Sequence, residues 1–154
     1  SPTLPGTPVS AGCSGCINFT QTYGIPCKDG CQVNSELARR LKTLDEELKI
    51  MGFNNSWRVT EAWPPTVIHR DECHKIGTCI DAGAVGASNG NLNWIKAYIA
   101  AADKAGLRVE YETKDPARYT QLLNSIPGAV SGQKSGVRYI AGGITGEHFS
   151  VYMR

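Results

Sequence analysis

The chain has 154 residues, of which 41% are hydrophobic and 19% are charged. This length and composition are typical of one globular domain with a core of ordinary size. The formal net charge of +2 is too small to indicate a nucleic-acid partner. No apolar run approaches the roughly 20 residues that a membrane-spanning helix requires, so membrane insertion is not expected.

Residues 1–12 are rich in Pro, Ser, Thr and Gly, a composition that predicts an extended tail or linker. They contain no basic, apolar leader, so an exported chain is expected to have lost its signal peptide already. A tail of this kind could dock on a neighbouring molecule, which makes self-assembly through residues 1–12 one expectation.

Six cysteines favour disulfide bonds, and therefore a secreted or cell-surface protein. Four of them lie in residues 13–32, spaced as C-x-x-C and C-x3-C, and Cys73 and Cys79 form a further close pair. That pair would bond either internally or to the N-terminal cysteines. The alternative is a structural zinc knuckle built from the first four thiols. We favour disulfides because the pair at 73 and 79 has no second pair to complete such a site.

Residues 33–154 are expected to form an α+β domain, in which a small, mainly antiparallel sheet packs against two or three helices. Leucines at helical spacing predict a first helix that ends near Gly52. A second helix is predicted from about Asn91 to Ala105, and a short one begins at Asp115-Pro116. Strands are predicted over residues 57–63, from residue 79, and over 107–112, 137–141 and 148–152, with a Gly-rich turn before the last one.

The segment Cys73–Asp81 carries the residues that indicate chemistry. His74 and Asp81 are seven residues apart, and Gly77 between them allows the backbone to turn tightly. An imidazole nitrogen and a carboxylate oxygen are good zinc ligands, and taking both from one segment lowers the entropy cost of building a site. His148 on the last predicted strand would supply a third ligand. The sequence therefore predicts a zinc site held by His74, Asp81 and His148.

The run His-x-x-Gly-x-(small)-x-Asp, followed far downstream by a histidine on the final strand, resembles the D-Ala-D-Ala metallopeptidases. This family includes D,D-carboxypeptidases, D,D-dipeptidases and phage L-alanyl-D-glutamate endopeptidases, and it shares its fold with the hedgehog signalling domain. The resemblance covers about residues 33–152. It implies a hedgehog/DD-peptidase-like fold, in which zinc on His74, Asp81 and His148 activates a water molecule that cleaves peptidoglycan stem peptides.

The resemblance also implies a residue that polarises the substrate carbonyl. In the family an arginine near the end of the strand before the motif has this role, which falls here on Arg70 or, as a second choice, on Arg58. The family usually has serine two residues before the first ligand, where this chain has Glu72.

The catalytic acid of the family has no direct counterpart in this chain. It lies three residues before the final histidine, a position that Thr145 occupies here. The nearest carboxylate is Glu147, which in a regular strand would point away from a metal bound by its neighbour His148. His69 and Glu61 are further candidates for the missing proton-transfer group.

Three functional hypotheses follow from the sequence. The first is a secreted zinc peptidase that acts on peptidoglycan stem peptides by D,D- or L,D-type cleavage. The second is a catalytically inactive relative that serves as a cell-surface binding or assembling subunit. The third is a small disulfide-rich secreted domain in which the motif is a coincidence.

Overall fold

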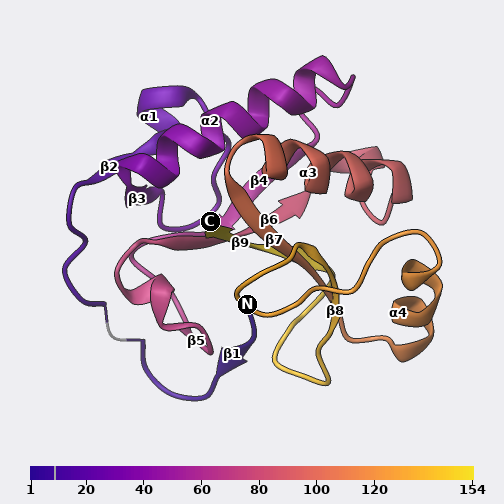
Figure 1. Cartoon of the computed structure of the whole chain (residues 1–154). Coiled ribbons are helices and arrows are strands. Elements are labelled where there is room, and N and C mark those ends of the chain that lie inside the picture. The colour runs from indigo at the N-terminus through magenta and orange to yellow at the C-terminus, as the bar shows by residue number, and fades with distance from the viewer. Residues whose placement is uncertain (9) are drawn as a thin grey trace.

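A five-stranded sheet lies at the centre of the protein, as a computed structural model that describes residues 1–8 and 10–154 shows (Figure 1). Its strand order is β4-β6-β9-β7-β8, and every neighbouring pair is antiparallel except β7 and β8. The strands are β4 (Trp57–Glu61), β6 (Cys79–Ala84), β7 (Leu107–Thr113), β8 (Gly136–Tyr139) and β9 (His148–Met153). The predicted α+β fold with a mainly antiparallel sheet is confirmed.

The three longer helices each begin after a capping side chain. Asn34, Asn91 and Asp115 each accept hydrogen bonds from backbone amides of the first turn that follows. In the described residues the helices are α1 (Phe19–Tyr23), α2 (Ser35–Ile50), α3 (Leu92–Lys104) and α4 (Pro116–Leu123), with 3-10 turns η1 (Glu72–Lys75) and η2 (Gly86–Ser88). The three predicted helices are therefore found. The additional helix α1 has only five residues, too few for a periodic pattern to indicate it.

Two short strand pairs lie outside the central sheet. Strand β2 (Cys16–Asn18) pairs with β3 (Gln32–Asn34), and β1 (Thr3–Leu4) pairs with β5 (Ile68–His69), both in antiparallel orientation. The segment predicted as a tail is therefore extended, and its first residues lie against the domain. Val9, within that segment, lies outside the described residues.

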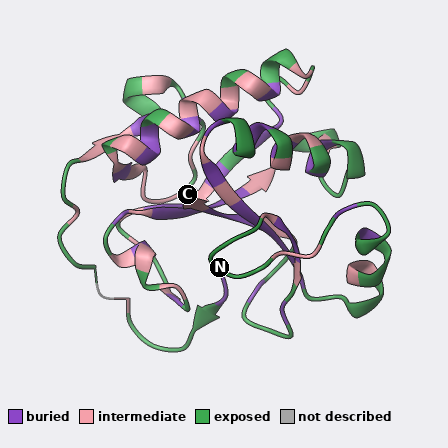
Figure 2. Ribbon diagram, viewed as in Figure 1, coloured by how far each residue is buried: buried purple, intermediate pink, exposed green. Residues whose placement is uncertain are grey.

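The two faces of the central sheet differ in chemistry. Helices α2 and α3 lie over one face, where the strands present buried apolar side chains (Figures 1 and 2). The opposite face carries buried polar side chains, because successive residues of a strand point to opposite sides. These polar residues are Glu61, Asp81, Glu110, Glu112 and Ser150.

The connection between the last two strands is longer than the turn that the sequence indicated. Strands β8 and β9 are not neighbours, because β7 lies between them, parallel to β8 and antiparallel to β9. Residues 140–147 therefore cross from the edge of the sheet to its centre. The glycines predicted as a turn, Gly142 and Gly143, lie within this crossing connection.

Three disulfides stabilise the described part of the chain, and none of its cysteines is free. They join Cys13 to Cys16, Cys27 to Cys31 and Cys73 to Cys79. The disulfides exclude the zinc-knuckle alternative, because the thiols that it required are used in covalent bonds. They fit an extracytoplasmic protein, since such bonds persist in oxidising compartments. Among the described residues, no helix combines the length and apolar character needed to cross a bilayer.

The core face can be tested at Phe149, which is fully buried and stacks on Tyr98 with a centroid distance of 4.3 Å. We expect Phe149→Ala to lower the free energy of unfolding by about 3–5 kcal/mol, because it leaves a cavity between sheet and helices. Ile50→Ala, at a side chain that is 78% exposed, should change it by less than about 0.5 kcal/mol. Urea denaturation measures both, and similar losses in the two variants would contradict this core.

Candidate metal centre

The segment between η1 and β6 turns back on itself and brings two candidate ligands together. Gly77 has a φ of +73°, in the left-handed region that favours glycine, and the Cys73–Cys79 disulfide closes the turn. Nε2 of His74 consequently lies 3.7 Å from Oδ1 of Asp81, and both residues are buried.

Strand β5 brings His69 to the same point. Its Nδ1 lies 3.6 Å from Oδ2 of Asp81, and its ring stacks on His74 with a centroid distance of 3.7 Å. Ligand atoms of His69, His74 and Asp81 all lie within 4.8 Å of one another. This buried group of two imidazoles and one carboxylate could hold a metal ion.

His148, at the start of β9, faces the same point from the central strand. Its Nε2 lies 4.0 Å from Oδ1 of Asp81 and 3.1 Å from Oε1 of Glu112. Its Nδ1 lies 3.1 Å from the carbonyl oxygen of Gly146, a hydrogen bond that requires the proton on Nδ1. Nε2 is therefore the ring nitrogen that faces the site.

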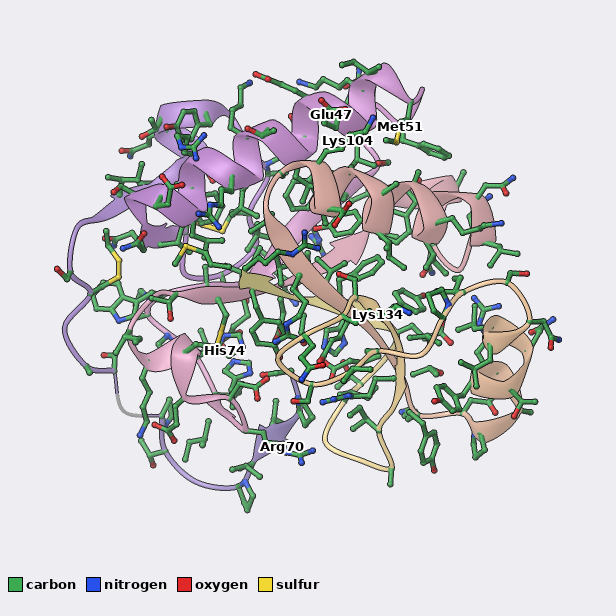
Figure 3. The ribbon with its side chains drawn as sticks, in the orientation of Figure 1. Glu47, Met51, Arg70, His74, Lys104 and Lys134 are labelled. Carbon is green, nitrogen blue, oxygen red and sulfur yellow. A yellow bond between two sulfur atoms is a disulfide. The ribbon has the colours of Figure 1, made fainter. Side chains whose placement is uncertain are left out.

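We call His69, His74, Asp81, Glu112 and His148 the donor cluster. Its members come from β5, η1, β6, β7 and β9, so it assembles only when the sheet has formed. Figure 3 shows His74 directed toward the space between η1 and the sheet.

The amino group of Ser1 lies inside the donor cluster. It forms an ion pair with Asp81, and it lies 3.3 Å from Oε1 of Glu112 and 3.2 Å from Nε2 of His148. A positive charge thus stands where two buried carboxylates converge. Such compensation is required, because unpaired buried charges are strongly unfavourable.

The hydroxyl group of Ser1 lies against the other two members of the cluster. Its oxygen is 2.9 Å from Nε2 of His74 and 3.2 Å from Nδ1 of His69. The two polar groups of a single residue therefore contact all five side chains of the donor cluster.

Two members of the cluster, His74 and Glu112, have the protonation states that metal ligands require. Burial, together with the charges of His69, the Ser1 ammonium and His148, lowers the pKa of His74 to about 2, so the ring is neutral. Burial raises the pKa of Glu112, but His148, the Ser1 ammonium and Ser150 outweigh it, and the resulting pKa is about 2. A neutral imidazole and an ionised carboxylate are the forms that bind a divalent cation.

A third carboxylate, that of Glu61, lies behind His69. Oε1 of Glu61 lies 3.2 Å from Nε2 of His69, and Oε2 accepts a hydrogen bond of 2.8 Å from the Thr66 hydroxyl. Burial raises the pKa of Glu61, but His69 and Thr66 lower it below its usual value. Carboxylates in this position commonly orient a histidine at a metal site. Neither Nε2 of His69 nor Nδ1 of His74 makes a hydrogen bond among the described residues, so the contact of His69 with Glu61 is one of charge and proximity.

Glu147, a predicted catalytic candidate, is engaged on the core side of the sheet. Its carboxylate accepts hydrogen bonds of 2.7 Å from Tyr111, 3.0 Å from Thr113 and 3.2 Å from Arg118. Tyr111 and Thr113 alternate along β7 with Glu112, so they point to the face opposite the donor cluster. The strand geometry expected from the sequence applies here.

The two arginine candidates lie outside the donor cluster. Arg70 is exposed at the end of β5, and its backbone amide donates a 2.7 Å hydrogen bond to the carbonyl of Pro2 (Figure 3). Arg58 on β4 is exposed as well and lines an open pocket together with Thr145 and His148. Arg58 is therefore the arginine that shares a pocket with a member of the cluster.

The sequence did not predict that Glu112 and Ser1 lie at this site. Glu112 lies on a strand in which Arg108, Glu110 and Glu112 alternate with apolar residues, a pattern that indicates one polar face. This pattern does not show that Glu112 lies opposite His148, which depends on the register between β7 and β9. No local signal marks Ser1.

No family model, curated protein or solved structure matches this chain.

Glu147→Gln tests whether Glu147 is structural. We expect the free energy of unfolding to fall by about 1–3 kcal/mol, because the charged acceptor for Tyr111 and Arg118 is lost, while zinc affinity stays unchanged. Glu72→Gln is the control, since that side chain is 79% exposed and should alter neither property. Urea denaturation and zinc titration measure the two, and weaker zinc binding in Glu147→Gln would contradict the assignment.

Proposed function

We propose that this protein is a secreted zinc peptidase that cleaves peptidoglycan stem peptides. The observation that carries the proposal is the convergence of three imidazoles and two carboxylates on one buried point. Buried ionisable groups gathered in this way are more typical of functional sites than of cores. The disulfides support export, and the His74-to-Asp81 spacing, which resembles the D-Ala-D-Ala metallopeptidases, supports the choice of substrate.

His74, Asp81 and His148 would hold the zinc ion in this proposal. Zinc bound there would supply Lewis acidity and lower the pKa of a bound water. The hydrogen bond to Gly146 orients the ring of His148, and the Glu61 carboxylate lies 3.2 Å behind Nε2 of His69. We assign His69 to positioning the ring of His74, on which it stacks.

Glu112 is the carboxylate that would move protons. It lies within the cluster, whereas Glu61 lies behind His69 and Glu147 lies on the core face. The hydroxyl of Ser150 donates a 2.6 Å hydrogen bond to its Oε1, which fixes the carboxylate. Being ionised, Glu112 can accept a proton from an attacking water and pass it to the leaving amine. It would thus replace the acid that is missing at Thr145.

A second candidate function is a non-catalytic surface subunit. Thr145 in place of an acid and Ser1 within the cluster both favour it. In this case His69 would be a fourth ligand, because zinc sites closed by four protein ligands are structural. Assembly through residues 1–12 would then require part of this segment to leave the domain, and size-exclusion chromatography with and without these residues would test it.

Zinc content tests the site. Purified, untagged protein should bind about one zinc per chain, as a single three-ligand site does. His74→Ala, Asp81→Ala and His148→Ala should abolish binding, because each removes a ligand. His69→Ala should weaken it only about 10–100-fold, as loss of a supporting residue does. Competition with a chromophoric chelator measures each affinity. If His69→Ala abolishes binding as completely as His148→Ala, the site is closed and the non-catalytic function is favoured.

Cleavage of purified sacculi tests the activity. Zinc-loaded protein should release stem-peptide fragments, and Glu112→Gln should lower the rate about 10²–10⁴-fold with zinc retained, because proton transfer is lost. Mass spectrometry of the released fragments gives the rate and the bond cut. Intact sacculi with fully zinc-loaded protein, together with cleavage restored by Thr145→Glu, would show that the natural chain is inactive.

A further inference from the structure

We propose that the cleft between β5 and residues 140–147 binds an extended peptide by strand addition, with the amino-terminal end of the peptide at the donor cluster. In the structure, residues 1–4 of the same chain occupy this cleft. Binding of the peptide does not depend on zinc. Only its consequence for cleavage rests on the function proposed above.

Main-chain contacts hold residues 1–4 on both sides. Thr3 lies opposite His69 in the antiparallel pairing of β1 with β5, and the amide of Arg70 donates to the carbonyl of Pro2 at 2.7 Å. On the other side, the amide of Thr3 donates to the carbonyl of Gly143 at 2.8 Å. Contacts of this kind recognise the extended shape of a peptide more than its side chains.

Gly143 permits this close approach. Its φ is +83°, and a Cβ atom there would lie 2.9 Å from the carbonyl oxygen of Thr3, closer than such atoms pack. The preceding Gly142 would meet nothing within 4 Å. The crossing connection thus approaches the bound strand closely at one glycine and leaves the adjacent one open.

Burial decreases along the occupant away from the donor cluster. The side chain of Ser1 is fully buried, whereas Leu4 is 50% exposed. Ser1 meets imidazole and carboxylate groups, while the side chains of Thr3 and Leu4 are exposed. The cleft should therefore select a small polar residue at its first position and tolerate varied residues further along.

The direction of the occupant bears on the bond that would be cleaved. The segment leaves the cluster toward its carboxyl end, so a substrate in the same orientation has at least four residues on the leaving side. In hydrolysis the water oxygen bonds to the carbonyl carbon, the C–N bond breaks and the leaving nitrogen takes a proton. Glu112, whose Oε1 lies 3.3 Å from the Ser1 nitrogen, is the carboxylate that would supply this proton. This geometry favours cleavage of internal bonds over release of a single terminal residue.

Peptide binding to zinc-free protein tests the inference. Thr3→Pro removes the amide that donates to Gly143 and should loosen the occupant. We expect this variant to bind the peptide Ser-Pro-Thr-Leu-Pro-Gly, labelled at its carboxyl end, about tenfold more tightly than the unaltered chain does, because competition by residues 1–4 is reduced. Thr7→Pro is the matched control, since Thr7 is exposed beyond β1, and it should bind like the unaltered chain. Fluorescence anisotropy measures the affinities.

Two further experiments test the direction of the bound peptide and its close approach to Gly143. The peptide of reversed sequence should not compete with the labelled one. Thr3→Pro combined with Gly143→Ala should bind the labelled peptide at least tenfold more weakly than Thr3→Pro alone, whereas adding Gly142→Ala should have no effect. Equal binding of both sequences, or no binding to Thr3→Pro, would overturn the inference. Because zinc is absent, neither outcome bears on the proposed metal site.

Discussion

The structure depends on the placement of two carboxylates, Asp81 and Glu112, on one buried face of the sheet. Removing two like charges from water is tolerated only when positive charge and hydrogen bonds lie close to them. Here the Ser1 ammonium group lies against both carboxylates, and Nε2 of His148 lies 3.1 Å from Glu112. A divalent cation held by the same imidazoles would provide compensation of the same kind.

The sheet stabilises this arrangement because one of its faces carries apolar side chains and the other carries polar ones. On one side Phe149 and Tyr98 belong to an apolar core with α2 and α3. On the other side, the neighbouring residues His148 and Ser150 face the donor cluster. Asp81 lies between Ile80 and Ala82, Glu112 follows Tyr111, and His148 precedes Phe149. These core residues limit how far the polar side chains can move. Sites on packed strands of this kind hold their geometry better than sites on loops.

The parts of this structure that the sequence predicts are local, and the parts that it does not predict depend on strand order. Caps and leucine spacing identify the longer helices, and the glycine between His74 and Asp81 identifies the turn that joins them. His69 was considered only for proton transfer, because its proximity to Asp81 requires β5 to fold over the sheet. The sequence does not predict Glu112 as a site residue, because its contact with His148 requires β7 and β9 to be neighbours. Pairing between distant segments leaves no periodic signal in either of them.

The position of Glu112 bears on the threonine at position 145. In the register between β7 and β9, Glu112 lies directly opposite His148, so its carboxylate reaches the ring from the neighbouring strand. A carboxylate three residues before His148 would instead have to reach the ring from the crossing connection. A carboxylate at either position would lie beside the ring of His148. Only the carboxylate on β7 belongs to a strand whose neighbouring residues, Val109 and Tyr111, are buried in the core. The crossing connection does not carry this acid, and at Gly143 its backbone lies close to the strand formed by residues 1–4. The proposed function therefore does not require an acid at position 145, because the sheet supplies a carboxylate beside His148.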